Sequence, residues 1–213
     1  MNAVKVKICG ITNADDAAAA VDAGADAVGF VFYAKSPRCV EPHVVARIVA
    51  TLPPFVLPVG VFVNEDATRV RALMDDCGLA LAQLHGEETA AYCASLGRPA
   101  LKAIRAAHQA ALLALAEYRG RAGVRGFVVD ACSESGYGGT GTLADWTLAS
   151  HVAQAGPILL AGGLTPDNVA EAVRTVRPYG VDVSSGVEAA PGKKDHAKVR
   201  AFVRSAKLAS ATP

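Results

Sequence analysis

The chain has 213 residues, of which 52% are hydrophobic and 19% are charged, and its formal net charge at pH 7 is +1. This length suits one domain with a large core and excludes two comfortable domains. There is no basic stripe and the aromatic content is only 6%, so neither the electrostatics nor the stacking groups of a nucleic-acid-binding protein are present.

Short β-branched apolar runs alternate along the chain with Ala- and Leu-rich amphipathic stretches. The apolar runs predict strands over residues 4–9, 26–32, 56–62, 80–85, 100–105, 124–130, 157–161 and 180–184. The amphipathic stretches predict helices over residues 13–23, 42–51, 65–77, 87–96, 107–118, 145–153, 166–175 and 195–208. This strict alternation predicts an α/β fold with a parallel sheet covered by helices.

Some helix ends carry their own signals. Asn13 precedes an Ala-rich run and is expected to cap it. Thr165 precedes a proline, which predicts a capping hydroxyl followed by proline at the first helical position. Gly24, Gly78 and Gly97 follow helical stretches, where left-handed C-terminal caps are expected.

Two architectures fit the alternation: an open doubly wound sheet and a closed (β/α)₈ barrel. The number of strand–helix units favours the barrel, although the chain is shorter than the ~250 residues typical of that fold, so the loops must be short. We expect a single catalytic domain over residues 1–208. The small, polar tail over residues 209–213 is expected to be frayed.

The cysteines are scattered, odd in number and form no Cys-x-x-Cys pair, so neither a disulfide framework nor a zinc site is expected. They are Cys9, Cys39, Cys77, Cys93 and Cys132. Free thiols favour a reducing compartment. The first residues show no signal peptide and no apolar run is long enough to span a membrane, so a cytoplasmic protein is expected.

In a barrel, function gathers where the strands end, and the loops after the seventh and eighth strands are the frequent phosphate site. Here those ends carry glycines, which let a backbone approach a ligand closely, and serines, which donate hydrogen bonds to oxyanions. They are Gly162, Gly163, Ser184, Ser185 and Gly186. Either glycine pair alone is more typical of a tight turn, but both together favour phosphate binding.

Cys9 ends the first predicted strand, and strand parity places Lys5 and Lys7 on the same face. If that face lines the barrel interior, a lysine ammonium lies beneath the thiol and lowers its pKa, which favours the thiolate. The alternative is that Cys9 is a small buried hydrophobic residue, the commoner fate of a lone cysteine.

Three other side chains at predicted strand ends are candidates for chemistry. Asp130 follows a run of valines, where burial raises a carboxyl pKa and suits a general acid; a cap or a salt bridge is the alternative. Arg38 suits bidentate binding of a carboxylate, or is solvated. His85 has three alternative roles: it binds a ligand, it acts as an acid–base group, or it is a histidine of the core.

Two motifs are rejected. Residues 136–141 have the spacing G-x-G-x-x-G, but they do not follow their strand directly and no acidic residue ends the next strand, so a flexible lid over the barrel mouth is preferred. His85-Gly86-Glu87 resembles the start of a zinc deaminase motif, but no Pro-Cys-x-x-Cys follows.

Taken in order, several stretches resemble the phosphoribosylanthranilate isomerase family of tryptophan biosynthesis. They are KICGIT at 7–12, GADAVGFVFYAKSPR at 24–38, PVGVFVN at 58–64, QLHGEE at 83–88, GGTGTLADW at 138–146, AGGLTPDNV at 161–169 and VDVSSGVEAAPGKKDH at 181–196. They cover the chain from end to end. The resemblance implies a TIM barrel that converts an N-linked aminoaldose 5-phosphate to a 1-amino-1-deoxyketose by an Amadori rearrangement.

By motif position, the resemblance implies that Asp130 is the general acid that opens the furanose and Cys9 the general base that removes the C2 proton. Arg38 resembles the group that neutralises the substrate carboxylate, and the glycines and serines after the seventh and eighth strands resemble the phosphate site. Asp182 and His85 are expected to contact the sugar or the anthranilate. Such an isomerisation needs an acid, a base and exclusion of water, so no metal and no cofactor are expected.

Two other functions are compatible with the predicted barrel. The histidine-pathway isomerase runs the same rearrangement, but its family places an aspartate where Cys9 stands and shows half-barrel repetition, which is not seen here. A non-catalytic phosphosugar-binding protein on the same scaffold would need neither Cys9 nor Asp130. The sequence leaves the oligomeric state open between a monomer and a homodimer.

Overall fold

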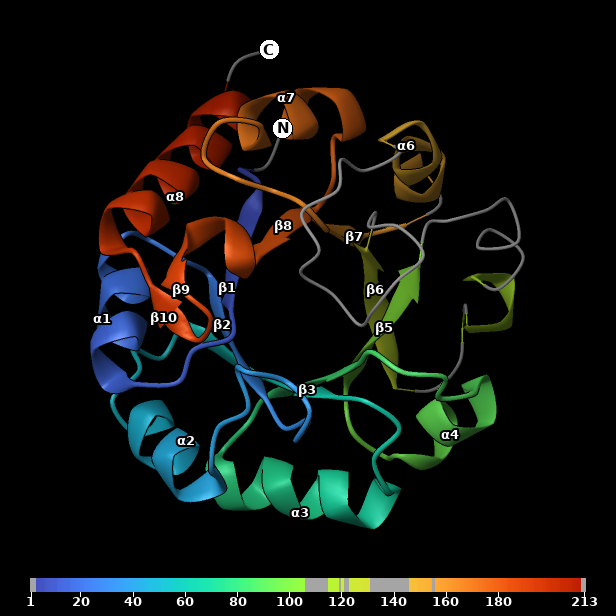
Figure 1. Cartoon of the computed structure of the whole chain (residues 1–213). Helices are drawn as coiled ribbons and strands as arrows, with labels where there is room; N and C mark the ends of the chain where they lie inside the picture. Colours follow the sequence, from blue (N-terminus) through green and yellow to red (C-terminus); the bar gives the residue numbers. More distant parts are fainter. Residues whose placement is uncertain are drawn as a thin grey trace.

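The computed structural model describes residues 3–105, 115–118, 120, 123–130, 146–154 and 156–211. Its strands form one closed parallel barrel in the order β1-β2-β3-β4-β5-β6-β7-β8 (Figure 1). Their bounds are β1 Lys5–Cys9, β2 Ala27–Val31, β3 Leu57–Phe62, β4 Leu81–Leu84, β5 Ala100–Arg105, β6 Val124–Asp130, β7 Ile158–Ala161 and β8 Gly180–Val183. Closure is direct, because β1 pairs with β8 from Lys5 opposite Gly180 to Ile8 opposite Val183.

The helices form a ring outside the barrel (Figure 1). Their bounds are α1 Ala14–Asp22, α2 Pro42–Val49, α3 Ala67–Cys77, α4 Ala90–Ser95, α6 Trp146–Gln154, α7 Val169–Val176 and α8 His196–Ala211. Residues 115–118 are also helical, within the helix expected over 107–118. The rest of that helix, Cys132 and the lid expected at 136–141 lie outside the described residues.

The barrel and the alternation of strands and helices are therefore confirmed, and the open doubly wound sheet is excluded. Four of the expected helix ends also hold, among them Gly24 and Gly97, which follow α1 and α4 at φ +90° and +64°. The Asn13 side chain accepts a hydrogen bond from the Asp16 backbone N–H at the start of α1. Gly78 ends α3 at φ +66°, a left-handed conformation that glycine adopts without a steric penalty.

The structure differs from the sequence-based expectations in three places. Helix α7 begins at Val169 after Asn168, so Thr165 is not its N-cap; the Asn168 side chain instead accepts from the Thr165 backbone N–H. Helix α8 continues through Ala211, past its expected end at 208, because Ala209 is buried against the core. A short hairpin of β9 (Glu188–Ala190) and β10 (Lys193–Lys194) follows β8 and was not expected.

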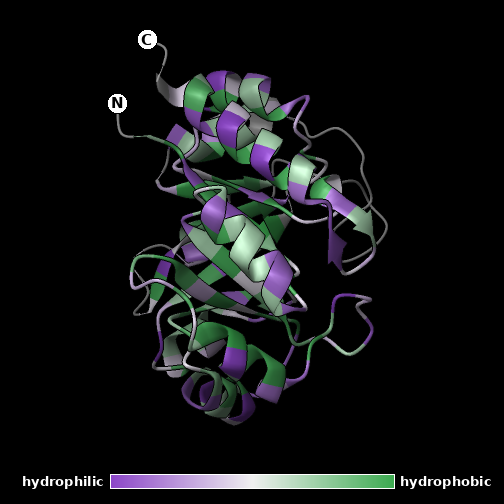
Figure 2. Ribbon diagram, turned by 90° about the vertical axis from the view of Figure 1, so that its left-hand side faces the viewer, coloured by the Kyte–Doolittle hydropathy of each residue, from purple (hydrophilic) through white to green (hydrophobic). Residues whose placement is uncertain are grey.

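Strand parity decides which side chains enter the barrel. Val6 and Ile8 of β1 point outward and pack in the main core between sheet and helices. Lys7 and Cys9 alternate with them and therefore point into the barrel interior. The side view in Figure 2 shows green strand segments in the centre, while purple bands alternate with green along the surrounding helices. The barrel interior contains buried polar side chains beside a small apolar cluster. Several of these polar side chains belong to the candidate site. The polar groups include Lys7, Gln83, Asp130 and Asp182.

Candidate active site

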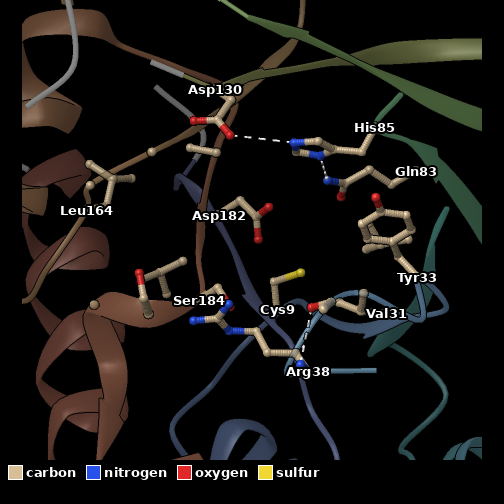
Figure 3. Close-up of a pocket in the computed structure, with 18 of the residues that line it drawn as sticks. Cys9, Val31, Tyr33, Arg38, Gln83, His85, Asp130, Leu164, Asp182 and Ser184 are labelled. Carbon is tan, nitrogen blue, oxygen red and sulfur yellow. Dashed lines mark hydrogen bonds and ion pairs between the residues drawn. The ribbon is translucent and has the colours of Figure 1, made fainter. Parts of the chain in front are cut away.

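A pocket opens at the carboxyl ends of the strands and gathers every residue that the sequence assigned to a site. Its lining includes the two expected catalytic side chains, the three expected substrate-binding side chains and the whole expected phosphate set. These residues are Cys9, Asp130, Arg38, His85, Asp182, Gly162, Gly163, Ser184, Ser185 and Gly186. In Figure 3, Cys9 and Asp130 lie on opposite sides of the pocket, with Asp182 between them in the view. The candidate acid–base side chains and the candidate phosphate-binding residues thus line one pocket.

Cys9 ends β1 and is almost fully buried in the interior. Space for it comes from Gly29 on β2, where an added Cβ would lie 2.9 Å from the Cys9 sulfur. The sequence predicted a lowered thiol pKa, and this is wrong. Burial raises the pKa of Cys9 above its ordinary value, and the positive charge of Lys7 opposes this shift without overcoming it.

Asp130 ends β6 and is buried at the opposite side of the mouth. His85 Nε2 lies 3.5 Å from Asp130 Oδ2, and Gln83 Nε2 lies 3.0 Å from His85 Nδ1. An amide nitrogen can only donate, so in this arrangement Nδ1 accepts and Nε2, the nitrogen that faces Asp130, carries a hydrogen. The Nε2–H group of His85 is therefore directed toward the Asp130 carboxyl group.

Arg38 lines the pocket but already has a protein partner. Its Nε and Nη2 donate to the two carboxylate oxygens of Glu188 at 2.8 and 2.7 Å, a bidentate ion pair. Lys194 Nζ donates to the same Glu188 at 2.9 Å. The remaining N–H groups of the Arg38 guanidinium stay available for a ligand, and Figure 3 shows that group beside Ser184.

The loops after β7 and β8 touch each other and form one wall of the pocket. Gly162 and Gly163 have φ values of +91° and +64°, which favour glycine. A Cβ on Gly186 would collide with the Leu164 carbonyl oxygen, so only glycine lets the two loops meet. Among the described residues, the hydroxyl of Ser184 is buried without a hydrogen-bond partner. A buried hydroxyl without a protein partner at a pocket wall can be satisfied by a bound water or ligand.

Sequence reasoning missed several residues of this site. Glu188 pairs with Arg38, and Lys194 pairs with Glu188. Both residues belong to the unexpected hairpin, and no local sequence signal distinguishes them from surface charges. Gln83 does have a signal, because it alternates with Leu84 on β4 and must face the interior. Its Oε1 is also buried without a partner in the described part of the chain. Tyr33 completes the wall beside Gln83 (Figure 3).

Within the described ranges, no cluster of His, Cys, Asp or Glu side chains has the geometry to hold a metal ion. No helix in the described part of the chain is both long and apolar enough to cross a membrane.

The fold and the pocket together define the class of protein: a (β/α)₈-barrel enzyme whose mouth brings a buried cysteine and a buried carboxyl group together with the loops after β7 and β8. The chain matches the sequence profile of N-(5'-phosphoribosyl)anthranilate isomerase over residues 6–205. It is 53% identical to the N-(5'-phosphoribosyl)anthranilate isomerase of Pelobacter propionicus over 204 residues, which is 96% of each chain.

Solved structures agree. The phosphoribosyl anthranilate isomerase of Thermotoga maritima superposes with a TM-score of 0.89 at 42% identity, covering 96% of this chain and 99% of that one. A phosphoribosyl anthranilate isomerase in complex with reduced 1-(o-carboxyphenylamino)-1-deoxyribulose 5-phosphate gives a TM-score of 0.86 at 41% identity, with the same coverage. Monomers generated from the dimeric T. maritima isomerase give 0.85 at 40% identity, again with 96% and 99% covered.

The chain belongs to the N-(5'-phosphoribosyl)anthranilate isomerase family. It is an enzyme of tryptophan biosynthesis, and its reaction is the isomerisation of N-(5'-phosphoribosyl)anthranilate to 1-(2-carboxyphenylamino)-1-deoxyribulose 5-phosphate.

Proposed function

We propose that Cys9 is the general base and Asp130 the general acid of this isomerisation. The observation that carries the proposal is their placement: both are buried, both line one pocket, and they lie on opposite sides of it (Figure 3). A ligand between them meets an acid on one side and a base on the other, as proton transfer at two sites of one substrate requires.

The reaction then needs two proton transfers. Protonated Asp130 gives its proton to the ring oxygen of the ribose, the bond from C1 to that oxygen breaks, and the nitrogen lone pair forms a protonated Schiff base. The Cys9 thiolate removes the C2 proton, and the electron pair moves into the C1–C2 bond to give an enolamine, which tautomerises to the ketone. The His85 N–H facing Asp130 stabilises the carboxylate left after the first transfer.

The other pocket residues bind the substrate. Arg38, held by Glu188, offers its remaining N–H groups to the anthranilate carboxylate. The touching loops after β7 and β8 hold the phosphate through Gly162, Gly163, Ser184, Ser185 and Gly186, and the unpartnered Ser184 hydroxyl supports this assignment. Asp182 and His85 face the space between these anchors and contact the sugar or anthranilate.

Alkylation tests this placement. Iodoacetamide should inactivate the enzyme by modifying Cys9, and millimolar inorganic phosphate should slow the inactivation because an anion in the pocket blocks the reagent. Peptide mass spectrometry locates the modification. Cys39, which is exposed, serves as the internal control and should react at the same rate with and without phosphate. Inactivation through another cysteine, or no protection by phosphate, contradicts the proposal.

A homodimer is the assembly we propose, as in the dimeric T. maritima relative. At the amino ends of the strands, a second cavity is rimmed by Phe55, which is 96% exposed, and by the half-exposed Tyr179. The cavity lining is mixed, with leucines beside charged side chains such as Lys5 and Arg125. An exposed phenylalanine beside it is self-complementary, because a two-fold axis places each Phe55 in the cavity of the other copy.

Light scattering coupled to gel filtration tests this assembly. The unaltered chain should elute as a dimer, and Phe55→Asp should elute as a folded monomer, since the change removes the aromatic ring from the interface and adds a carboxylate that loses water there. Leu208→Asp is the control, because Leu208 is exposed on α8, outside this cavity. A monomeric unaltered chain, or a Phe55→Asp dimer, would rule out this interface.

The cytoplasm is the compartment we propose. The described cysteines are all free thiols, which supports a reducing environment.

A further inference from the structure

Two lysines of the barrel strands are almost fully buried, Lys7 on β1 and Lys102 on β5. Lys7 points into the barrel, whereas Lys102 alternates with the interior residues Leu101 and Ala103 and therefore points outward. Lys102 has an evident structural role, because its Nζ donates to the Leu84 carbonyl at 3.3 Å, the Gly86 carbonyl at 2.6 Å and Glu88 Oε2 at 3.0 Å, and so braces the loop after β4. Lys7 braces no loop. Its Nζ contacts the two oxygens of one carboxylate, that of Asp182 on β8, at 2.9 and 3.0 Å.

Burying the Lys7–Asp182 pair is costly, because removing two charges from water offsets most of their attraction. Such a pair is therefore weak evidence of a stabilising role. Its position next to the proposed base is the informative feature. A Cβ added to Gly29 would lie 2.9 Å from the Cys9 sulfur and 3.1 Å from Lys7 Nζ. The thiol and the ammonium thus share the space that the missing Gly29 side chain leaves open.

We propose that Lys7 is a positioning residue that keeps Cys9 available as a thiolate, with Asp182 holding the ammonium beneath the sulfur. The inference rests on the proposed role of Cys9 as the base. It gives the buried pair a role in the reaction in addition to any contact that Asp182 makes with substrate.

The charges around Cys9 support this role. Burial raises the pKa of the thiol, and Lys7 opposes that rise through its charge and a hydrogen bond. Asp182 raises the thiol pKa by a smaller Coulombic effect, and Lys194 on β10 lowers it weakly. Arg38 also interacts with Cys9 by its charge. Lys7 is the strongest of the cations that oppose the burial of Cys9.

Lys7 itself stays charged. Its burial lowers the ammonium pKa, but the charges of Asp182 and Cys9 and the hydrogen bonds to both outweigh burial, so its pKa lies above the ordinary value. The charged ammonium is therefore the favoured form of Lys7 beside Cys9. A fixed cation under a buried thiol favours the thiolate without needing to move a proton of its own.

The pH dependence of Cys9 alkylation by iodoacetamide tests the inference without relying on turnover. The matched variants are Lys7→Met and Lys102→Met, which each remove one buried lysine and keep a side chain of similar length. At neutral pH, Lys7→Met should slow Cys9 alkylation on the order of tenfold, and the rise of the rate with pH should move to higher pH. Lys102→Met should leave the Cys9 profile unchanged. Equal profiles for the unaltered chain and Lys7→Met overturn the inference.

A second variant guards against misfolding of Lys7→Met, in which Asp182 is left as an unpaired buried charge. The double variant Lys7→Met/Asp182→Asn removes both charges. Because Lys7 influences Cys9 more strongly than Asp182 does, its alkylation profile should still move to higher pH, by less than in the single variant. A profile that moves to lower pH, or not at all, overturns the inference.

Turnover separates this inference from the proposed mechanism. If both are right, Lys7→Met lowers kcat and moves the low-pH limb of kcat to higher pH together with the alkylation profile. If the alkylation profile moves while kcat and its pH profile do not, Lys7 tunes the thiol as inferred, but Cys9 is not the base. That result overturns the proposed mechanism and, with it, the role of Lys7 in the reaction.

Discussion

Cys9→Ala should lower kcat by about 10²–10⁴-fold, the usual contribution of a positioned general base. KM should change little, because the phosphate loops and Arg38 remain in place. Folding should be normal, since alanine removes one sulfur from a side chain that borders an open pocket rather than the closed core. Steady-state kinetics, followed by the loss of anthranilate-type fluorescence, measures the effect. Cys39→Ala, at an exposed position outside the pocket, is the matched control.

The pH profile gives this result a second readout. The thiolate is the reactive form and burial raises the pKa of Cys9, so kcat/KM of the unaltered enzyme should increase with pH along its low-pH limb. Lowering the pH returns the proton to the sulfur and removes the base. Cys9→Ala should lose this limb together with the rate. Wild-type turnover by Cys9→Ala removes the residue from the mechanism.

Asp130→Asn should reduce kcat by a similar factor of about 10²–10⁴, because the amide has the shape of the carboxyl group but no transferable proton. The contact with His85 can persist, since an amide oxygen still accepts from the imidazole N–H. The fold should therefore be preserved, and circular dichroism together with thermal unfolding checks that it is.

Asp75→Asn provides the control for this second substitution, because Asp75 is an exposed carboxylate on α3 that pairs with Arg98. It should retain full activity. If Asp130→Asn turned over at the wild-type rate, another group would have to protonate the ring oxygen, and the assignment of the acid would be wrong. A variant that binds substrate but fails to open the ring is the expected outcome.

Periodicity predicted a parallel α/β fold, and the number of strand–helix units favoured the barrel over an open sheet. Strand parity put Lys7 and Cys9 on one face, and the closed barrel shows that this face is the interior. The limits show where packing overrides local signals. Helix α7 begins after Asn168, not at Thr165, because the Asn168 side chain bonds to the Thr165 N–H and the Gly163 carbonyl and shapes the loop.

The amino-acid sequence by itself determined which residues stand at the strand ends, and hence which could meet at one mouth, because strand period and chain order are local properties. Only the tertiary structure decided what those residues touch. Arg38 pairs with Glu188, 150 positions away, and Lys7 with Asp182, 175 positions away.

The pKa of the Cys9 thiol also depended partly on the sequence and partly on the tertiary structure. The sequence put Lys7 and Cys9 on the same face of β1, but the net direction of the thiol pKa shift depends on how far burial removes the sulfur from water. Charges that pair across the barrel leave no mark in the local sequence, and desolvation is a property of the closed fold. For that reason the sequence predicted which residues form the site, but not the direction of the Cys9 pKa shift.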